Sequence, residues 1–168
     1  GQHYTYMGFE RPFSDEGLER AIKELDVSLL QGLALASKEV YNLLTLGISV
    51  EEKIVVDKHD PVKKSFDIKY IDFEHPDNNI WQVTEEFSVE RANGQYARPD
   101  IVIMCNGIPV VVVECKKSSI DIMEGVLQNV RNMTPEYIPQ LFKYAQLVLA
   151  VKPEKVLYGT SGTTAEYF

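Results

Sequence analysis

Two apolar segments joined by Asn106-Gly107 constrain the fold of this chain more than any other feature. Asp100 to Cys105 precedes the dipeptide and Pro109 to Lys116 follows it. Asn-Gly is the strongest short-range signal for a tight β-hairpin, because both residues tolerate positive φ. The four consecutive valines from Val110 to Val113 are typical of a strand that is buried on both faces. The sequence therefore predicts a hairpin whose second strand lies at the centre of a sheet.

The register of this hairpin decides whether Asp100 and Glu114 share a face. Glu114 and Lys116 are two residues apart, so their side chains lie on one face of the strand. A two-residue loop would pair position 100 with 113 and turn Asp100 away from Glu114. A three-residue loop, or a bulge with the same effect, opposes the two carboxylates instead, with about 5 Å between Cβ atoms. We expect this second register, since Pro109 cannot donate to the ladder and favours an irregular start to its strand.

Helices and further strands are predicted on both sides of the hairpin. Residues 14 to 16 offer capping oxygens to a first amphipathic helix, and a second helix is expected from near Ser37 until Gly47. The face of the first helix is predicted from apolar residues at helical spacing: Leu18, Ala21, Ile22, Leu25 and Leu29. Alternating residues over 66–70 and 81–87, with a Pro-Asp-Asn-Asn turn between them, indicate two paired strands.

The remaining pattern completes an α/β plan. A helix from Asp121 toward Pro135 and a short helix over 138–142 precede a buried strand at 147–151. This order predicts one domain over residues 1–168 with a mixed central sheet flanked by helices. The final residues show no terminating pattern, so we expect a fragment of a longer protein.

Composition narrows the class of protein. A net charge of -8 over 168 residues argues against a surface that grips nucleic acid everywhere. Carboxylates that hold a divalent ion add negative charge, so a nuclease is still compatible. No apolar stretch approaches the roughly 20 residues of a membrane helix. The two cysteines, Cys105 and Cys115, have neither metal-ligand spacing nor disulfide density. A cytoplasmic protein without membrane contact is expected.

Asp100, Glu114 and Lys116 form the candidate catalytic set. Two adjacent carboxylates repel unless a cation neutralises them, and their hard oxygens suit Mg²⁺ or Mn²⁺. The backbone carbonyl of Cys115 is a candidate third ligand, and its side chain is predicted to be a small core residue on the opposite face. The alternative for Glu114 and Lys116 is the solvated end of a strand, where both residue types are ordinary. Spacing alone does not separate the two hypotheses.

The hairpin closely resembles the nuclease core of type I restriction enzyme R subunits. The shared features are an Asp before a strand, an Asn-Gly-aliphatic-Pro turn, an apolar run and a Glu-x-Lys ending, here within Arg98 to Lys117. The resemblance is weaker over the first 60 residues. It continues through flanking segments: Ile71-Asp72-Phe73, the Asn-Asn-Ile-Trp stretch, Pro139 to Leu149 and Tyr158-Gly159-Thr160.

This resemblance implies a restriction-endonuclease-like fold of the PD-(D/E)XK superfamily and a metal-dependent endonuclease that hydrolyses DNA phosphodiester bonds. It implies that Asp100 and Glu114 are metal ligands and that Lys116 is the catalytic lysine of a type II-like site. The family tends to carry Gln-x-x-x-Tyr on the next helix. Gln128 matches, whereas Asn132 stands at the tyrosine position, which puts that DNA contact in doubt. Gln128 and Lys117 are the candidate DNA-contacting residues, with solvent-exposed positions as the alternative.

The resemblance also implies partners. Such R subunits continue into an ATP-driven translocase and assemble with modification and specificity subunits in bacteria and archaea. We expect double-stranded DNA as substrate and ATP only in the absent motor, since Gly159 to Thr164 lacks the Gly-Lys-Ser/Thr of a phosphate-binding loop. Two alternatives are open: a junction or repair nuclease on the same fold, and a noncatalytic DNA-binding or assembly module. The acidic charge favours the module, whereas the intact Asp, Glu and Lys set speaks against it.

Overall fold

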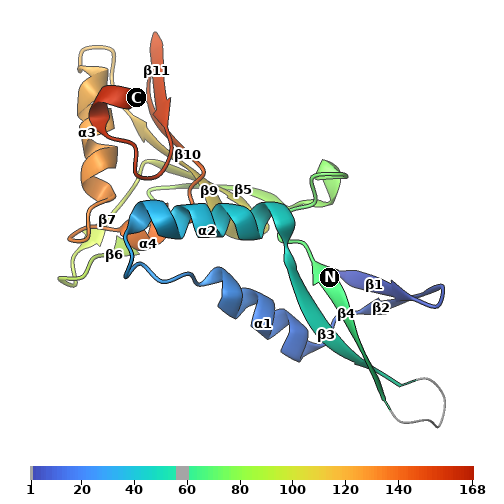
Figure 1. Ribbon diagram of the computed structural model, residues 1–168. Helices are drawn as coiled ribbons and strands as arrows, with labels where there is room; N and C mark the ends of the chain where they lie inside the picture. Colours follow the sequence, from blue (N-terminus) through green and yellow to red (C-terminus); the bar gives the residue numbers. More distant parts are fainter. Residues whose placement is uncertain (1, 56–60) are drawn as a thin grey trace.

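A five-stranded mixed sheet forms the centre of the computed structural model, which describes residues 2–55 and 61–168 (Figure 1). Its strand order is β11-β10-β9-β8-β5. β9 and β10 are parallel, and the other neighbours are antiparallel. The strands span Trp81–Glu85 (β5), Ile101–Cys105 (β8), Ile108–Cys115 (β9), Leu147–Lys152 (β10) and Lys155–Gly159 (β11). The predicted mixed sheet, with the valine strand β9 in its centre, is confirmed.

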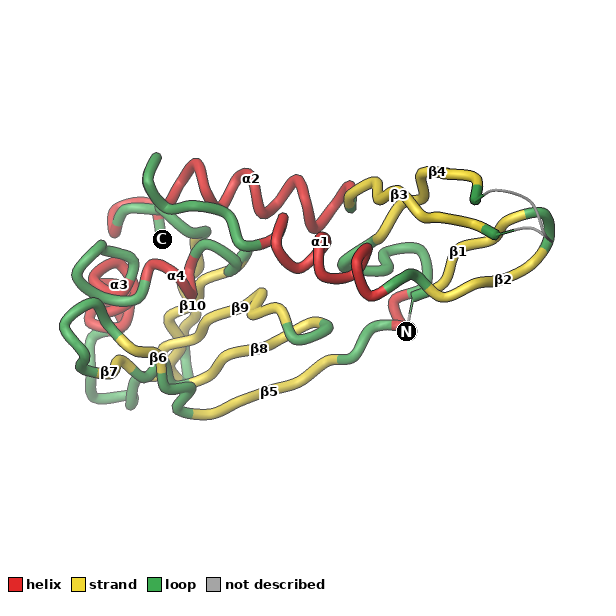
Figure 2. Tube along the Cα trace, turned by 90° about the horizontal axis from the view of Figure 1, so that it is seen from below, coloured by secondary structure: helices red, strands yellow, loops and turns green. Residues whose placement is uncertain are grey.

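Within residues 2–55 and 61–168, four helices and three two-stranded ribbons accompany this sheet. The helices are α1 (Asp15–Leu25), α2 (Leu33–Leu46), α3 (Ile122–Asn132) and α4 (Pro139–Phe142), and two 3-10 turns, η1 and η2, span Pro76–Asn78 and Ala165–Tyr167. The ribbons pair β1 (His3–Tyr6) with β2 (Phe9–Pro12), β3 (Ile48–Ile54) with β4 (Val62–Ile68), and β6 (Val89–Glu90) with β7 (Tyr96–Ala97). β1–β2 and β3–β4 extend from the end of the molecule opposite α3 (Figure 2).

The core against the central sheet is built mainly by α3, α4 and the segment between them. Alternate residues of β8, β9 and β10 point into one apolar cluster, because strand side chains alternate between faces. Its fully buried members include Val102, Val112, Val148, Ile138 and Phe142. A smaller cluster joins α3 to β10 through Val126 and Ala150. The helix that follows the central hairpin is therefore fixed against the strands that end beside it.

The first helix packs through only part of the face that its sequence predicts. Ala21 is buried and Leu25 packs against the core as predicted, and Gly17 is buried as well, whereas Leu18 is 36% and Ile22 71% exposed. A Cβ at Gly17 would lie only 2.5 Å from Oε1 of Glu52 on β3, so the small residues face the strand and allow this close approach. The helix ends at Leu25, so the predicted extension of the face to residue 29 is wrong.

The predicted pairing of residues 66–70 with residues 81–87 is also wrong. β4 pairs with β3, in a register that joins Ile68 to Ile48, and β5 pairs with β8. The local pattern did not predict β3, because charged residues interrupt it, although Glu52 is buried and accepts a hydrogen bond from the Ser14 hydroxyl. The segment between β4 and β5 contains η1 instead of a hairpin turn. Helix α2 begins at Leu33, four residues before the predicted Ser37, and ends before Gly47 as predicted.

The central hairpin contains both a tight turn and a bulge. Cys105 pairs with Ile108, and the two loop residues have positive φ, 53° at Asn106 and 82° at Gly107, as a two-residue hairpin turn requires. The register then shifts, because Met104 pairs with Pro109 but Ile103 pairs with Val111. The predicted three-residue loop does not form. The bulge has the predicted effect instead, and it brings position 100 level with position 114.

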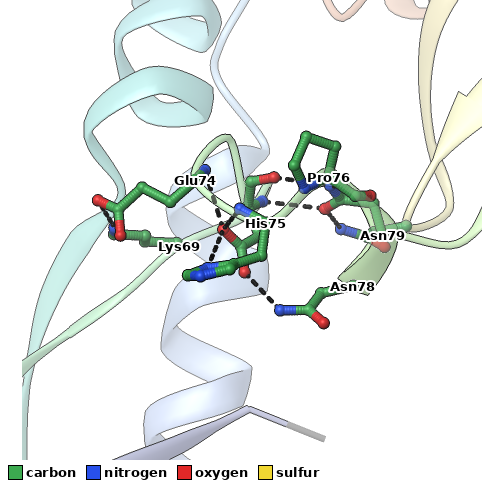
Figure 3. A network of polar contacts seen from close by, with 8 residues as sticks. Lys69, Glu74, His75, Pro76, Asn78 and Asn79 are labelled. Atoms are coloured by element: carbon green, nitrogen blue, oxygen red, sulfur yellow. Dashed lines mark hydrogen bonds and ion pairs between the residues drawn. The ribbon is translucent and has the colours of Figure 1, made fainter.

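Asn106 ties the hairpin turn to the segment that precedes β5. Its amide nitrogen donates to the Tyr70 carbonyl and to Oδ1 of Asn79, both at 2.9 Å, and its Oδ1 accepts from Ile80 N–H at 2.8 Å. Asn79 belongs to a polar network that Figure 3 shows around His75 and Asn78. Asp72 lies within this network and accepts the backbone N–H groups of Glu74 and His75. The Asn106 side chain therefore links the hairpin turn to the segment from Tyr70 to Ile80, which is distant in sequence.

We predict that Asn106→Ala lowers the free energy of unfolding by about 2 kcal/mol. Each of its hydrogen bonds contributes about 1 kcal/mol, and alanine tolerates positive φ less well than asparagine. Urea unfolding measures the change. The matched control is Asn93→Ala in the β6–β7 turn, where the side chain bonds only to nearby Gln95, and we expect a change within about 0.5 kcal/mol. Equal effects of the two substitutions would contradict this stabilising role of the Asn106 hydrogen bonds.

Candidate active site

Asp100, Glu114 and Lys116 come together where the central strand ends. Oδ2 of Asp100, the residue just before β8, accepts the Cys115 N–H at 2.6 Å. Glu114 lies on β9 opposite Ala150 of the parallel strand β10. The Lys116 ammonium is 3.6 Å from Oε2 of Glu114, with a lysine side chain that is only 17% exposed. The three residues that the sequence singled out therefore form one cluster.

Glu114 is the most unusual of them electrostatically. Its side chain has no exposed surface, and neither carboxylate oxygen accepts a hydrogen bond from any described residue. Burial raises the pKa of Glu114 to about 7, the nearby Asp100 adds to this rise, and Lys116 opposes it. A buried carboxylate that accepts no hydrogen bond costs free energy, and the Lys116 ammonium 3.6 Å away offsets only part of that cost. The carboxyl group should therefore hold a proton or a cation near neutral pH.

Lys116 is held by helix α3. Its ammonium donates to Oε1 of Gln128 at 2.9 Å. Its aliphatic stem crosses the helix at Gly125, where an added Cβ would lie 3.3 Å from Cγ of Lys116 and 3.2 Å from Cβ of Ala150. The helix begins at its predicted place, since the Asp121 side chain accepts the Met123 N–H as an N-cap. Gly125 was not singled out from the sequence, although an isolated glycine in a helical pattern often marks close packing.

The other predicted site residues have varied surroundings. Lys117 is exposed, and Gln128 is half-buried beside Lys116. Asn132, at the position where a tyrosine was expected, is buried with no partner for its Oδ1 among the described residues, so it offers no surface contact. The prediction that Cys115 has a core side chain is wrong, because this residue is exposed. At the end of β9 the face opposite Glu114 is solvated rather than packed.

The surface beside Lys116 is hollowed. A depression of about 460 Å³ is lined by Lys116, Gln128 and Arg131, together with Ile120, Glu124 and Leu127. Arg131 in the last turn of α3 lies over the Tyr137 ring, and so does Arg91, which follows β6. Periodicity analysis of the sequence gave no reason to connect these arginines with the site. Their grouping depends on how the β6–β7 ribbon packs beside the end of α3.

The donors available to a cation are few. Across residues 2–55 and 61–168 no three His, Cys, Asp or Glu side chains gather as a metal cluster. Two carboxylates, those of Asp100 and Glu114, lie together at the end of β9. None of the helices in the described residues is long and apolar enough to span a bilayer.

Comparison with known proteins agrees with the resemblance of the hairpin. The sequence pattern of the family described as Type I restriction enzyme R protein N terminus matches residues 6–167. The type I restriction enzyme SsaAORF53P endonuclease subunit of Staphylococcus saprophyticus is 33% identical over 136 residues. The SauCOLORF180P endonuclease subunit of Staphylococcus aureus strain COL is 34% identical over 136 residues. Each alignment covers 76% of this chain and 14% of the relative.

Fold and site together define a mixed α/β domain with two carboxylates and a lysine at the end of its central strand. The family match covers nearly the whole chain. This protein belongs to the family of type I restriction enzyme R protein N termini. It spans about one seventh of the length of the relatives it matches.

We predict that Glu114→Gln stabilises the fold above pH 7 in a buffer that contains EDTA. The folded state keeps the Glu114 proton up to about pH 7, whereas an unfolded glutamate releases it near its ordinary pKa of 4.5. Wild-type stability should therefore fall as pH rises between these values, by up to about 3 kcal/mol. The variant should lack this fall, so the two proteins should differ little at pH 4.5 and most at pH 8.

Chemical unfolding at several pH values measures this difference. The control is Glu19→Gln, an exposed position on α1, which should keep the wild-type pH dependence. A Glu114→Gln variant that is less stable than wild type at pH 8 would show that Lys116 compensates the buried charge fully.

Proposed function

We propose that this chain is a nuclease domain of the PD-(D/E)XK type within a type I restriction enzyme R subunit, and that it hydrolyses DNA phosphodiester bonds with Mg²⁺ or Mn²⁺. One observation carries the proposal. The fully buried Glu114 carboxylate has no hydrogen-bond donor among the described residues, lies beside a second carboxylate, and has a lysine ammonium 3.6 Å away. A purely structural glutamate at this place would need a partner.

The donor set fits a hard divalent cation. Mg²⁺ is usually held by one or two carboxylates, and substrate phosphate and water complete its coordination. Asp100 and Glu114 would supply the carboxylates and the Cys115 carbonyl a further oxygen. When bound, such an ion polarises the phosphodiester and stabilises the charge that develops during hydrolysis. Neutralisation of Glu114 would also remove the cost of its burial.

The lysine completes the proposed chemistry. Lys116 would orient the attacking water or donate to the phosphate oxygens as their negative charge increases. Gln128 accepts from the Lys116 ammonium and so restricts where it can point. We therefore assign Gln128 a positioning role. The exposed Lys117 would contact a phosphate of bound DNA.

The endonuclease-subunit names of the relatives suggest the setting. The aligned region is only 14% of each relative's length, and we propose that this chain is one domain of such a subunit. In that setting the substrate is double-stranded DNA, ATP serves only the motor region outside this chain, and the partners are modification and specificity subunits. The complex would act in the cytoplasm of a bacterium or archaeon.

A noncatalytic DNA-binding or assembly module is the second candidate function. The net charge of -8 and the buried Asn132 at the tyrosine position favour it. It would keep the fold without binding a divalent ion. Metal affinity therefore separates the two functions even where cleavage is weak.

We predict that calorimetric titration of Mn²⁺ or Mg²⁺ detects binding to the wild-type chain and at least tenfold weaker binding to Asp100→Asn, because the variant loses one anionic ligand. Lys116→Ala should still bind metal, yet it should nick supercoiled plasmid at least about a hundredfold more slowly, as expected for loss of a group that stabilises developing charge. The matched control is Asp67→Asn, which removes an exposed carboxylate from β4.

The outcomes separate the candidates. Metal binding that depends on Asp100 together with nicking that depends on Lys116 supports the nuclease. Equally poor metal binding by wild type and Asp100→Asn, with no nicking by either, overturns the proposed site and favours the assembly module. Nicking that survives in Lys116→Ala would mean that the activity comes from a contaminant or another site.

A further inference from the structure

Two arginines from distant segments meet at a single tyrosine ring. Arg91 follows β6, Arg131 lies in the last turn of α3, and Tyr137 lies between α3 and α4. The guanidinium carbon of Arg91 is 3.9 Å from the centre of the Tyr137 ring, and that of Arg131 is 4.9 Å from it. Arg91 also donates to the Glu136 carbonyl at 3.3 Å and to Oε1 of Gln95 at 3.1 Å. Arg91 is therefore held in place before any ligand binds, and Arg131 contacts the same ring.

Neither arginine has a carboxylate partner within the described ranges of the chain. This is unexpected in a protein with 25 acidic and 17 basic residues. Several other cations do form ion pairs with carboxylates: Arg20, Lys63, Lys69, Lys116 and Lys143. Two nearby cations repel each other, and the face of an aromatic ring offsets only part of this cost. The arrangement suits an anion that both guanidinium groups can bind.

The arginine pair is continuous with the candidate active site. Arg131 lines the same depression as Lys116 and Gln128, and it follows Gln128 by three residues, which is about 4.5 Å along α3. On the other side, the β6–β7 ribbon that carries Arg91 leads directly to Asp100 and lies next to the end of α3 (Figure 1). The depression beside α3 thus holds two cations, Lys116 and Arg131, and one carboxylate, Glu124, and Arg91 lies beside Arg131 at the Tyr137 ring.

We propose that Arg91 and Arg131 bind the phosphodiester backbone of the DNA strand that enters the candidate active site. The inference rests on the proposed nuclease function and adds a DNA contact to it. Guanidinium groups match phosphate geometry by donating two parallel hydrogen bonds. Because backbone phosphates carry no sequence information, this contact positions the strand without selecting a sequence. Local placement of these cations explains how a chain of net charge -8 binds a polyanion.

The test measures DNA binding separately from cleavage. A fluorescently labelled duplex is titrated with the chain in EDTA at low salt, and fluorescence anisotropy is followed at several salt concentrations. We predict that Arg91→Gln combined with Arg131→Gln weakens binding at least tenfold and reduces the slope of log affinity against log salt by about 1 to 2, since each phosphate that is no longer neutralised lowers the slope by about 0.9. The control, Arg20→Gln on α1, removes a cation that is paired with Glu24 and should change affinity less than twofold.

Each outcome decides the inference. Wild-type affinity and salt slope in the double variant would overturn it, and so would a wild-type chain that does not bind the duplex at low salt. If the arginines serve only to pack on Tyr137, the variant melts at lower temperature while its affinity is unchanged. Should the double variant fail to fold, Arg131→Gln alone keeps the Arg91 contact with the ring and must still weaken binding.

The experiments also distinguish failure of the nuclease proposal from failure of the proposed arginine contact. Asp100→Asn is expected to bind the duplex in EDTA as wild type does or slightly better, since it loses only a negative charge. If the wild-type chain neither binds metal nor cuts, but DNA binding still depends on the two arginines, the nuclease proposal fails and the phosphate contact stands.

Discussion

The β-bulge in the central hairpin is the constraint on which the candidate site depends. The turn at Asn106 and Gly107 pairs Cys105 with Ile108, and continued without a shift this register would turn Asp100 away from Glu114. One additional residue in β9 corrects the register before the strand ends. A bulge inserts one residue without breaking the pairing on either side. The sheet can therefore keep its tight turn and still place two carboxylates side by side.

That juxtaposition has an energetic cost, which the surrounding structure tolerates. Glu114 is buried without a hydrogen-bond donor among the described residues, and its pKa is raised to about 7 by burial and by Asp100. Valines on β8, β9 and β10 pack with α4, and Ala150, which lies opposite Glu114 on β10, packs with α3. The Glu114 side chain has no exposed surface in this setting. Groups held at such a cost are typical of functional sites, where the ligand supplies the missing interaction.

Helix α3 connects this site with the surface. Its N-cap fixes its start, Gly125 lets the stem of Lys116 cross closely, and Gln128 receives the lysine ammonium. Arg131, in the last turn of the same helix, meets Arg91 at the Tyr137 ring. One helix thus contacts the proposed catalytic lysine and carries one of the two arginines. Precise sites are better held by helices and strands than by loops.

Local chemistry in the sequence determined the hairpin turn, the buried central strand, the start of α3 and the set of Asp100, Glu114 and Lys116. Each depends on residues close together in the chain: turn residues that accept positive φ, an apolar run, a capping side chain and a two-residue spacing. The tertiary structure alone decided the partners of β4 and β5, the inward face of α1, and the meeting of Arg91 with Arg131. These contacts join residues that are distant in sequence, and periodicity reports only which face is apolar, not what will cover it.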